Sequence, residues 1–183
     1  MLIKYNIGNS ILELTCGDIT IQDTEAIVNA ANRRLSPGGG VSGAIHRAAG
    51  PELWEENKKL GGCETGEAKL SGGHNLKAKY VIHTVGPVYS GSADDAQDLK
   101  NCYKNSLLLA SQKKTKSISF PSISTGIFGY PVKEASVIAL KTIADFLKEH
   151  QEIKLIRMVL FSEDDYKIYK SSLEKILKDK NTD

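Results

Sequence analysis

Short apolar segments of strand-like character alternate along this chain with longer segments whose apolar residues recur at helical spacing. The strand-like segments cover residues 4–7, 11–15, 26–28, 80–85, 117–120 and 155–161. Gly8, Asn9 and Ser10 favour a turn that folds the second segment back against the first. The pattern therefore begins with a hairpin and continues as strands separated by helices.

Three of the intervening segments predict helices with one apolar side. Their apolar stripes are Leu99, Cys102, Tyr103, Ser106, Leu107 and Ala110; Val132, Ala135, Ala139, Thr142, Ile143 and Phe146; and Tyr166, Tyr169, Leu173, Ile176 and Leu177. Pro131 precedes the second stripe and suits a first helical turn, and Ser162 with Asp165 can cap the third helix. Strands alternating with helices predict a largely parallel sheet covered on both faces, built as one domain over residues 1–183.

Several strand-like segments are followed by loops rich in glycine and in short polar side chains. These loops cover residues 17–19, 29–42, 122–130 and 161–162. Ligands of open α/β sheets bind beyond the carboxyl ends of the strands, where such loops lie side by side. We therefore expect the four loops to converge on one cleft.

The first long loop combines two carboxamides with a run of glycines. Asn29 and Asn32 precede the glycines at 38–40, and the segment from Ser42 onward is helix-like. Glycine lets the backbone approach a ligand closely, and the free N–H groups of a helix start favour phosphate. Because carboxamides can hydrogen-bond sugar hydroxyls without carrying charge, this loop indicates a phosphorylated sugar or a nucleotide.

A second glycine-containing loop follows the next-to-last strand-like segment. Ser124, Thr125, Gly126 and Gly129 supply hydroxyls and closely spaced N–H groups. The loop is either an ordinary strand-to-helix turn or a second phosphate site, and two such loops at one cleft would suit a diphosphate. Phe128 lies between the two glycines, where no core stripe requires an aromatic ring, which favours a functional role.

Four further residues allow a structural and a functional interpretation. Asp18 either bonds the backbone of its own turn or accepts a hydrogen bond from an exocyclic amine such as adenine N6. Phe161 either joins the core or stacks on a base. His83 lies within an apolar strand and His46 on the helix after the first glycine loop, and we expect both to be buried histidines with hydrogen-bonded rings.

Composition and residue spacing argue against several classes of function. The 24 Lys and Arg residues against 22 Asp and Glu give a net charge of +2, which does not indicate nucleic-acid binding. The 3 cysteines and 4 histidines are spaced like neither a disulfide framework nor a metal site. Without an apolar run of membrane-spanning length or a leader-like N-terminus, the sequence predicts a soluble cytoplasmic protein with no membrane partner.

Gly38, Gly40 and Gly43 match the spacing of a dinucleotide-binding fingerprint, but their context argues against a dehydrogenase. Residues 33–37 separate these glycines from the preceding strand. The region 54–62, where a ribose-binding acid would end a second strand, predicts a helix and a turn instead. The chain also lacks the P-loop motif of nucleotide-hydrolysing enzymes.

Together these motifs resemble the macro domain family, and within it the MacroD-type branch. The matching motifs are GDIT (17–20), AIVNAAN (26–32), GGGV (38–41), YVIHTVGP (80–87) and FPSISTGIFGYP (120–131), and the resemblance covers about residues 12–169. It implies a three-layer α/β/α macro domain with a central mixed, largely parallel six-stranded sheet that binds ADP-ribose. MacroD-type members remove ADP-ribose from acidic side chains and the acetyl group from O-acetyl-ADP-ribose, without a cofactor or a metal.

The resemblance also implies a role for each matching position. Asp18 would hold the adenine amine, with the backbone at Ile19 beside it and Phe161 near the base. Asn32 would bond the distal ribose and orient the reacting group, and Phe128 would pack against that sugar. The loops lining the phosphates would be Gly39, Gly40 and Val41 on one side, and Ser124, Thr125, Gly126, Ile127 and Phe128 on the other.

One position departs from hydrolytic MacroD-type members, in which an aspartate follows the Gly-Gly-Gly-Val loop. This chain has Ser42 there, and a neutral hydroxyl cannot take up a proton at pH 7 as a carboxylate can. Loss of a general base typically costs about two to four orders of magnitude in rate. Some macro domains without this acid still hydrolyse, with water held by the ligand's own diphosphate.

The sequence therefore leaves two main functions open. The first is a hydrolase of ADP-ribosyl esters with Asn32, Ser42 and Phe128 at the reacting centre, acting on O-acetyl-ADP-ribose or on mono-ADP-ribosylated proteins. The second is a module that binds ADP-ribose with little or no turnover. A third activity, ADP-ribose 1″-phosphate phosphatase, is slow in this family. We expect a monomer in each case.

Overall fold

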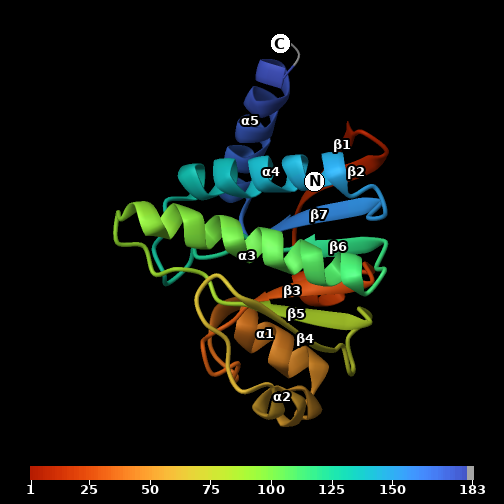
Figure 1. Cartoon of the computed structure of the whole chain (residues 1–183), viewed down its shortest axis with the longest axis vertical. Coiled ribbons are helices and arrows are strands. Elements are labelled where there is room, and N and C mark those ends of the chain that lie inside the picture. The colour runs from red at the N-terminus through yellow and green to blue at the C-terminus, as the bar shows by residue number, and fades with distance from the viewer. Residues whose placement is uncertain (181–183) are drawn as a thin grey trace.

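A mixed sheet of seven strands runs through the molecule in the order β1-β2-β7-β6-β3-β5-β4 (Figure 1). The computed structural model describes residues 1–180. The strands are β1 (Leu2–Ile7), β2 (Ser10–Cys16), β3 (Ala26–Ala30), β4 (Ala68–Gly72), β5 (Tyr80–Thr84), β6 (Ser117–Phe120) and β7 (Leu155–Leu160). The edge strands β1 and β4 are antiparallel to their neighbours, whereas every pairing between β2 and β5 is parallel. The inner strands therefore end at one edge of the sheet.

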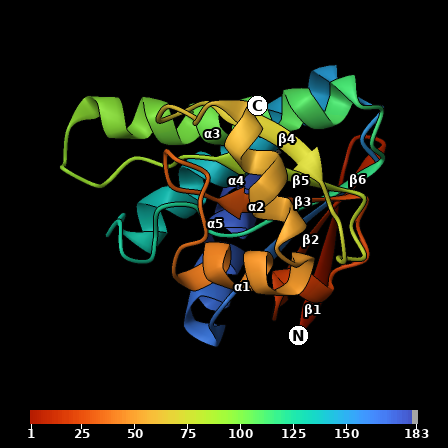
Figure 2. The same ribbon diagram turned by 90° about the horizontal axis from the view of Figure 1, so that it is seen from below.

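Helices cover both faces of this sheet, as the sequence pattern predicts. The helices are α1 (Gly40–Ala49), α2 (Glu52–Asn57), α3 (Ala93–Gln112), α4 (Val132–Glu149) and α5 (Glu163–Lys180), with 3₁₀ turns at Ile19–Ile21 (η1) and Lys58–Leu60 (η2). The apolar sides of α3, α4 and α5 pack on one face, and α1 and α2 pack on the other, near β3, β4 and β5 (Figures 1 and 2). The expected three-layer α/β/α architecture is confirmed.

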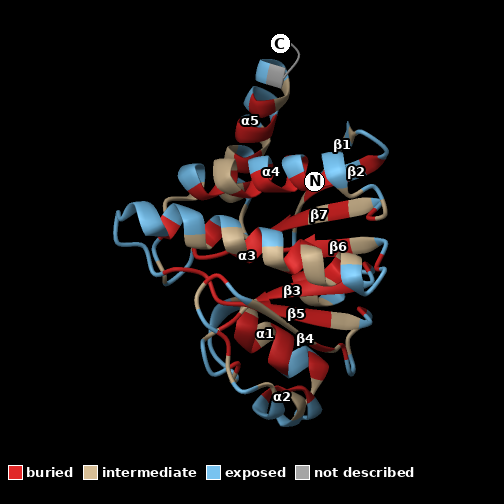
Figure 3. Ribbon diagram, in the orientation of Figure 1, coloured by how far each residue is buried: buried red, intermediate tan, exposed pale blue. Residues whose placement is uncertain are grey.

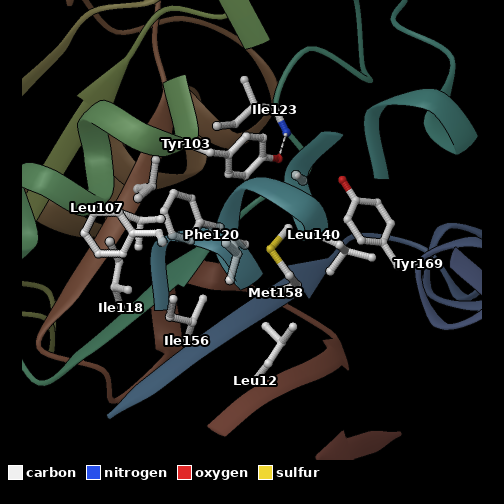
Figure 4. Close-up of a cluster of buried hydrophobic side chains, with 14 of the residues drawn as sticks. Leu12, Tyr103, Leu107, Ile118, Phe120, Ile123, Leu140, Ile156, Met158 and Tyr169 are labelled. Atoms are coloured by element: carbon white, nitrogen blue, oxygen red, sulfur yellow. Dashed lines mark hydrogen bonds between the residues drawn. The ribbon is translucent and has the colours of Figure 1, made fainter. Parts of the chain in front are cut away.

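The main core lies between the sheet and the layer formed by α3, α4 and α5, where buried residues concentrate (Figures 3 and 4). Tyr103, Phe120 and Tyr169 are fully buried there, and the rings of Tyr103 and Phe120 lie 5.2 Å apart. The hydroxyl of Tyr103 accepts a hydrogen bond from the backbone N–H of Ile123 at 3.2 Å, which the dashed line in Figure 4 marks. The core thus holds the start of the loop that follows β6.

Most of the local predictions hold. The turn at Gly8 and Asn9 joins β1 to β2, and α4 begins directly after Pro131, which occupies the N-cap position rather than the first turn. Ser162 Oγ accepts a hydrogen bond from the backbone N–H of Asp165 at 3.1 Å and so caps α5. The region 54–62 forms α2 and η2.

The expected number of six strands is wrong, because the sheet has a seventh strand, β4. Its sequence, Ala-Lys-Leu-Ser-Gly, contains one large apolar residue, Leu70, and most of its residues are only half-buried. An edge strand pairs on one side only and buries little surface, so it needs no regular apolar pattern. The sequence therefore carried no clear strand signal here.

A partly buried ion pair joins β2 to β7 on the face opposite α3, α4 and α5. Glu13 and Arg157 are direct partners in the parallel register, and Arg157 Nε donates to Glu13 Oε2 at 2.6 Å. Lys4 Nζ lies 3.0 Å from the other carboxylate oxygen. Burial by itself would raise the pKa of Glu13, but hydrogen bonds and charges from Arg157 and Lys4 lower it. The pair helps to fix how β2 and β7 align at the edge where their loops emerge.

A chain of hydrogen bonds under α1 links β3, β5 and β4. Asn29 Nδ2 donates to Nδ1 of His83 at 3.1 Å, so the other ring nitrogen carries the proton and donates to Ser71 Oγ at 2.9 Å. His83 is fully buried, and burial together with the nearby His46 lowers its pKa to about 3. The expectation of a buried, hydrogen-bonded histidine at this position is confirmed.

The neutral His83 should make stability depend on pH. Its pKa in the folded chain lies below the unfolded value of about 6.5, so the unfolded chain binds the extra proton. The contribution is complete above pH 6.5 and is lost as pH falls towards 3. Between pH 7 and pH 5 we expect a loss of about 2 kcal/mol in the free energy of unfolding.

Urea unfolding of the wild-type protein and of His83→Gln at each pH measures this effect. Because glutamine does not titrate, the stability difference between the two proteins should shrink by about 2 kcal/mol from pH 7 to pH 5. It should stay constant between pH 7 and pH 8, which provides the control. A difference that does not change with pH at all would contradict a buried neutral imidazole.

Candidate functional site

A cavity of about 230 Å³ opens at the carboxyl edge of the sheet, between the loop after β3 and the loop after β6. We call it the main cavity. It is lined by Ala30, Ala31, Asn32, Gly38, Gly39, Gly40, Val41, Ser42, Gly86, Ser122, Ser124, Gly126, Ile127 and Phe128. Two of the four loops that the sequence predicts to converge therefore meet here.

The loop after β3 is closed by the side chain of Asn32. Its Oδ1 accepts hydrogen bonds from the backbone N–H and the hydroxyl of Ser36, at 3.1 and 3.3 Å, and its Nδ2 donates to the Ser36 carbonyl at 3.0 Å. This clamp brings the glycine run to the start of α1. There, Gly43 must lack a side chain, because a Cβ would overlap the carbonyl oxygen of Gly38.

The glycine run presents unpaired backbone donors. The N–H of Gly43 bonds the carbonyl of Gly39 at 3.1 Å and is the first amide of this segment to find an acceptor. The N–H groups of residues 38–42 donate no hydrogen bond within the described chain, as expected where a helix begins. They form one row of positive dipole ends at the main cavity.

The loop after β6 presents a second row of donors. Ser124 has a φ of +66°, a left-handed conformation that is uncommon outside glycine. Its carbonyl accepts from the N–H of Tyr130 at 2.9 Å, and Gly129 N–H bonds the Gly126 carbonyl at 3.0 Å, so the loop folds back on itself. Within residues 1–180, the N–H groups of 124–128 have no acceptor. Such a concave set of amides favours an anion.

A side chain from α5 and hydroxyls within the loop support this second loop. Ser122 Oγ and the hydroxyl of the buried Tyr169 lie 2.7 Å apart, and Thr125 Oγ1 donates to the Ser122 carbonyl at 3.0 Å. The hydroxyl of Thr125 is therefore used inside the loop, and Thr125 does not line the main cavity. Its predicted contact with phosphate would have to come from its backbone N–H.

Two buried hydroxyls at the main cavity have no hydrogen-bond partner. They are Ser42 Oγ, in the first turn of α1, and Ser124 Oγ. A buried polar group without a partner costs about 1–3 kcal/mol, so an acceptor in the main cavity would recover this energy. None of the described residues lining the main cavity carries a charged side chain. The site therefore offers neutral donors to an anion.

His46 corrects one expectation. It is buried, as predicted, but its Nε2 atom has no hydrogen-bond partner among the described residues. Burial lowers its pKa, so the ring is neutral at pH 7. Ser42 and His46 lie four residues apart in α1 and therefore share one side of the helix. The sequence could not show that no partner packs against the ring.

The residues predicted to hold the adenine lie at the same edge of the sheet but outside the main cavity. Cys16 pairs with Leu160, and the N–H of Gly17 bonds the Leu160 carbonyl at 2.9 Å, so Asp18 and Phe161 leave neighbouring strands. The ring of Phe161 is 90% exposed and free to stack. This position excludes the alternative in which Phe161 belongs to the core.

Asp18 and Ile19 each have a structural role as well. Asp18 Oδ1 accepts from the backbone N–H and hydroxyl of Thr20, both at 2.7 Å, as the turn interpretation predicts. Its Oδ2 has no partner among the described residues, so it remains available to a donor from a ligand. The side chain of Ile19 is buried against Ile27 and Ile45, which leaves only its backbone for binding.

Of the two asparagines in the first loop, only Asn32 reaches the main cavity; Asn29 is fully buried under α1. Sequence reasoning missed Gly86 and Ser122 as lining residues. Gly86 follows β5, which ends beside β3 at the carboxyl edge, so the rule that identified the other loops could have found it.

Neither a metal-binding cluster nor a membrane-spanning helix occurs within residues 1–180. Within residues 1–180, no group of three or more His, Cys, Asp or Glu side chains is arranged to hold a metal ion. No helix in the same range is long and apolar enough to cross a membrane.

Known sequences and structures resemble this chain closely. The sequence model of the Macro domain matches residues 28–139. ADP-ribose glycohydrolase MACROD2 of Mus musculus is 53% identical over 160 residues, which cover 86% of this chain but only 34% of that protein. A macro domain-containing protein of Chlorobaculum tepidum is 49% identical over 166 residues, covering 90% of this chain and 96% of that protein. The chain thus spans about a third of the mouse relative.

Solved structures agree with this relationship. The macrodomain of Oceanobacillus iheyensis with ADP superposes with a TM-score of 0.95 at 46% identity, covering 98% of both chains. The macrodomain of Trypanosoma brucei in complex with ADP-ribose gives a TM-score of 0.83 at 44% identity, covering 87% of this chain and 68% of that one. Both likenesses extend over most of the sheet and its helices.

Gly86 provides a steric test of the main cavity. A Cβ at this position would overlap Ser124 Oγ and lie 2.7 Å from Ile123 Cγ2, so Gly86→Ala must shift the side chains of Ser124 and Ile123 in the loop after β6. We expect the affinity for ADP-ribose to fall at least about tenfold by calorimetry. Gly72→Ala is the control, since a Cβ there makes only an ordinary contact at 3.5 Å. If both folded variants bind like the wild-type protein, this loop does not hold the ligand.

Proposed function

Because this chain belongs to the Macro domain family, we propose that its main cavity binds ADP-ribose and that the protein hydrolyses ADP-ribosyl esters. The substrates would be proteins mono-ADP-ribosylated on glutamate or aspartate, and O-acetyl-ADP-ribose. The curated relatives named ADP-ribose glycohydrolase support hydrolysis of this general kind. The proposal requires neither a cofactor nor a metal.

The observation that carries this proposal is the pair of facing donor rows at the main cavity. The N–H groups of residues 38–42 and 124–128 lack acceptors, and the hydroxyls of Ser42 and Ser124 are buried without partners. A diphosphate between the rows would accept charge-assisted hydrogen bonds from several of these groups. No acidic side chain among the described lining residues would repel it.

The rest of the ligand would extend from both sides of the diphosphate. Asp18 and the exposed ring of Phe161 lie outside the main cavity, where β2 and β7 end, and would take the adenine. Asn32 and Phe128 line the main cavity and would take the distal ribose. The ester to be cleaved would then lie beside Asn32, whose clamp on Ser36 fixes its amide in place.

Hydrolysis at this position needs a water molecule and an acceptor for its proton. If the water oxygen bonds to the distal ribose carbon, the bond from that carbon to the ester oxygen breaks and a carboxylate leaves. If it bonds to the ester carbonyl carbon, the acyl–oxygen bond breaks, the ribose oxygen leaves as a hydroxyl, and the acid is released. The described lining of the main cavity contains no carboxylate, so the substrate's own diphosphate would hold the water in place and the proton would pass to solvent. Asn32 and Ser42 would orient the water and the ester rather than take up the proton.

Ser42 also supports the alternative function, a module that binds ADP-ribose with little or no turnover. Binding would use the backbone donors, Asp18 and Asn32, none of which depends on an acid at position 42. A hydroxyl in the first turn of α1 can donate to phosphate but is no base at pH 7. The alternative therefore predicts full affinity without catalysis.

One experiment separates the two functions. The protein is incubated with a peptide carrying ADP-ribose on glutamate, and the release of free ADP-ribose is followed by chromatography. We expect release faster than in a control without protein, together with calorimetric binding of ADP-ribose. If the protein binds ADP-ribose but releases it from the peptide no faster than the control, the hydrolase proposal is wrong and the binding module is supported.

Substitution of Ser42 tests how water is activated. We expect Ser42→Asp to raise turnover at least tenfold, because it supplies the missing carboxylate, and general bases contribute about 10²–10⁴-fold. Ser42→Asn is the matched control, with a similar shape but no basic oxygen, and should not increase the rate. Equal rates for the two variants would mean that the carboxylate has no role and that the substrate's own diphosphate activates the water.

A further inference from the structure

A second cavity adjoins the main cavity beyond its distal ribose end. Its volume is about 490 Å³, and it shares Asn32, Gly86 and Phe128 with the main cavity as a common wall. Its remaining walls come from the segment after β5 and from the first turns of α3, together with Arg33 and Thr65. Anything attached to a ribose at Asn32 and Phe128 would therefore extend directly into this second cavity, which we call the acceptor cavity.

The two cavities differ in charge. The described residues around the main cavity include no ionisable side chain, whereas Asp95, Asp98 and Arg33 line the acceptor cavity. These three side chains carry a net negative charge. The acceptor cavity would repel a diphosphate, so it suits a part of the substrate that is neutral or positively charged.

Among these groups, Asp98 is the one left without a partner. Asp95 accepts hydrogen bonds from the backbone N–H groups of Ser90 and Gly91, at 2.7 and 3.0 Å, and these bonds lower its pKa. Arg33 donates to Thr65 Oγ1 at 3.3 Å and lies 4.0 Å from Glu64. Asp98 is half-buried and makes no hydrogen bond or ion pair within residues 1–180.

We propose that the acceptor cavity holds the polypeptide that carries the ADP-ribose, and that Asp98 selects targets with a lysine or arginine next to the modified acidic residue. This inference rests on the proposed function, whose substrate class it specifies. The apolar groups of Pro87, Val88 and Phe128 pack against the stem of the modified side chain. Val88 is 63% exposed in the free protein, so part of this wall is open to a partner.

Three substrates test the proposal. Two are peptides with ADP-ribose on glutamate that differ only in having lysine or glutamate beside it, and the third is O-acetyl-ADP-ribose, which has no polypeptide. We expect kcat/KM for the lysine peptide to exceed that for the glutamate peptide about three- to fivefold, the usual effect of a partly exposed ion pair. In Asp98→Asn this ratio should fall to about one, and in Asp98→Lys it should invert.

The controls separate this effect from a general loss of function. Asp94→Asn removes the same charge from an exposed position one turn earlier in α3 and should keep the wild-type ratio. O-acetyl-ADP-ribose turnover and ADP-ribose affinity should be the same in all Asp98 variants. A ratio that persists in Asp98→Asn, or an equal loss with O-acetyl-ADP-ribose, would overturn the proposal.

The test remains decisive if the wild-type protein hydrolyses nothing. In that case the proposed hydrolysis fails, and the same ratio is measured from the dissociation constants of the two peptides. A preference for the lysine peptide that disappears in Asp98→Asn would support the acceptor cavity in a binding module. Equal dissociation constants for both peptides would overturn it.

Discussion

Parallel pairing of β3 with β5 and with β6 is the constraint on which the site depends. Ala26 aligns with Tyr80 on one side and with Ile118 on the other, so the three strands run in the same direction towards one edge of the sheet. The loops that carry Asn32, Gly86 and Ser124 must therefore meet, although they are far apart in the sequence. The hydrogen bonds of His83 to Asn29 and Ser71 reinforce this register across the neighbouring strands.

This geometry gives backbone amides and side chains different tasks in the proposed site. In the proposed function, the diphosphate is recognised by backbone amides that strand ends and a helix start leave without acceptors, and the few polar side chains orient the reacting groups. This separation explains how Ser42 can occupy the position of an acid without damage to the donor rows.

Sequence reasoning was most successful where local chemistry decides the structure. The glycine runs, the helix after the first glycine loop and the apolar strands are local signals, and they were enough to predict the layers and two of the converging loops, although α1 begins at Gly40 rather than at Ser42. The sequence analysis did not predict the edge strand β4, because a half-buried strand such as this one around Leu70 needs no regular apolar pattern. The missing partner of His46 and the free carboxylate of Asp98 depend on what packs nearby, which a single sequence does not record.

A binding site built largely from backbone amides has consequences for how this protein can change over evolutionary time. Backbone N–H groups remain in place after almost any side-chain substitution. Few substitutions would therefore lower the affinity for the diphosphate. The exceptions are places where the backbone is crowded, such as Gly43 against the Gly38 carbonyl and Gly86 against Ser124. The side chains that line the acceptor cavity are not constrained in this way. Substitutions there could therefore change which target proteins bind, while the backbone donors for the nucleotide stay the same.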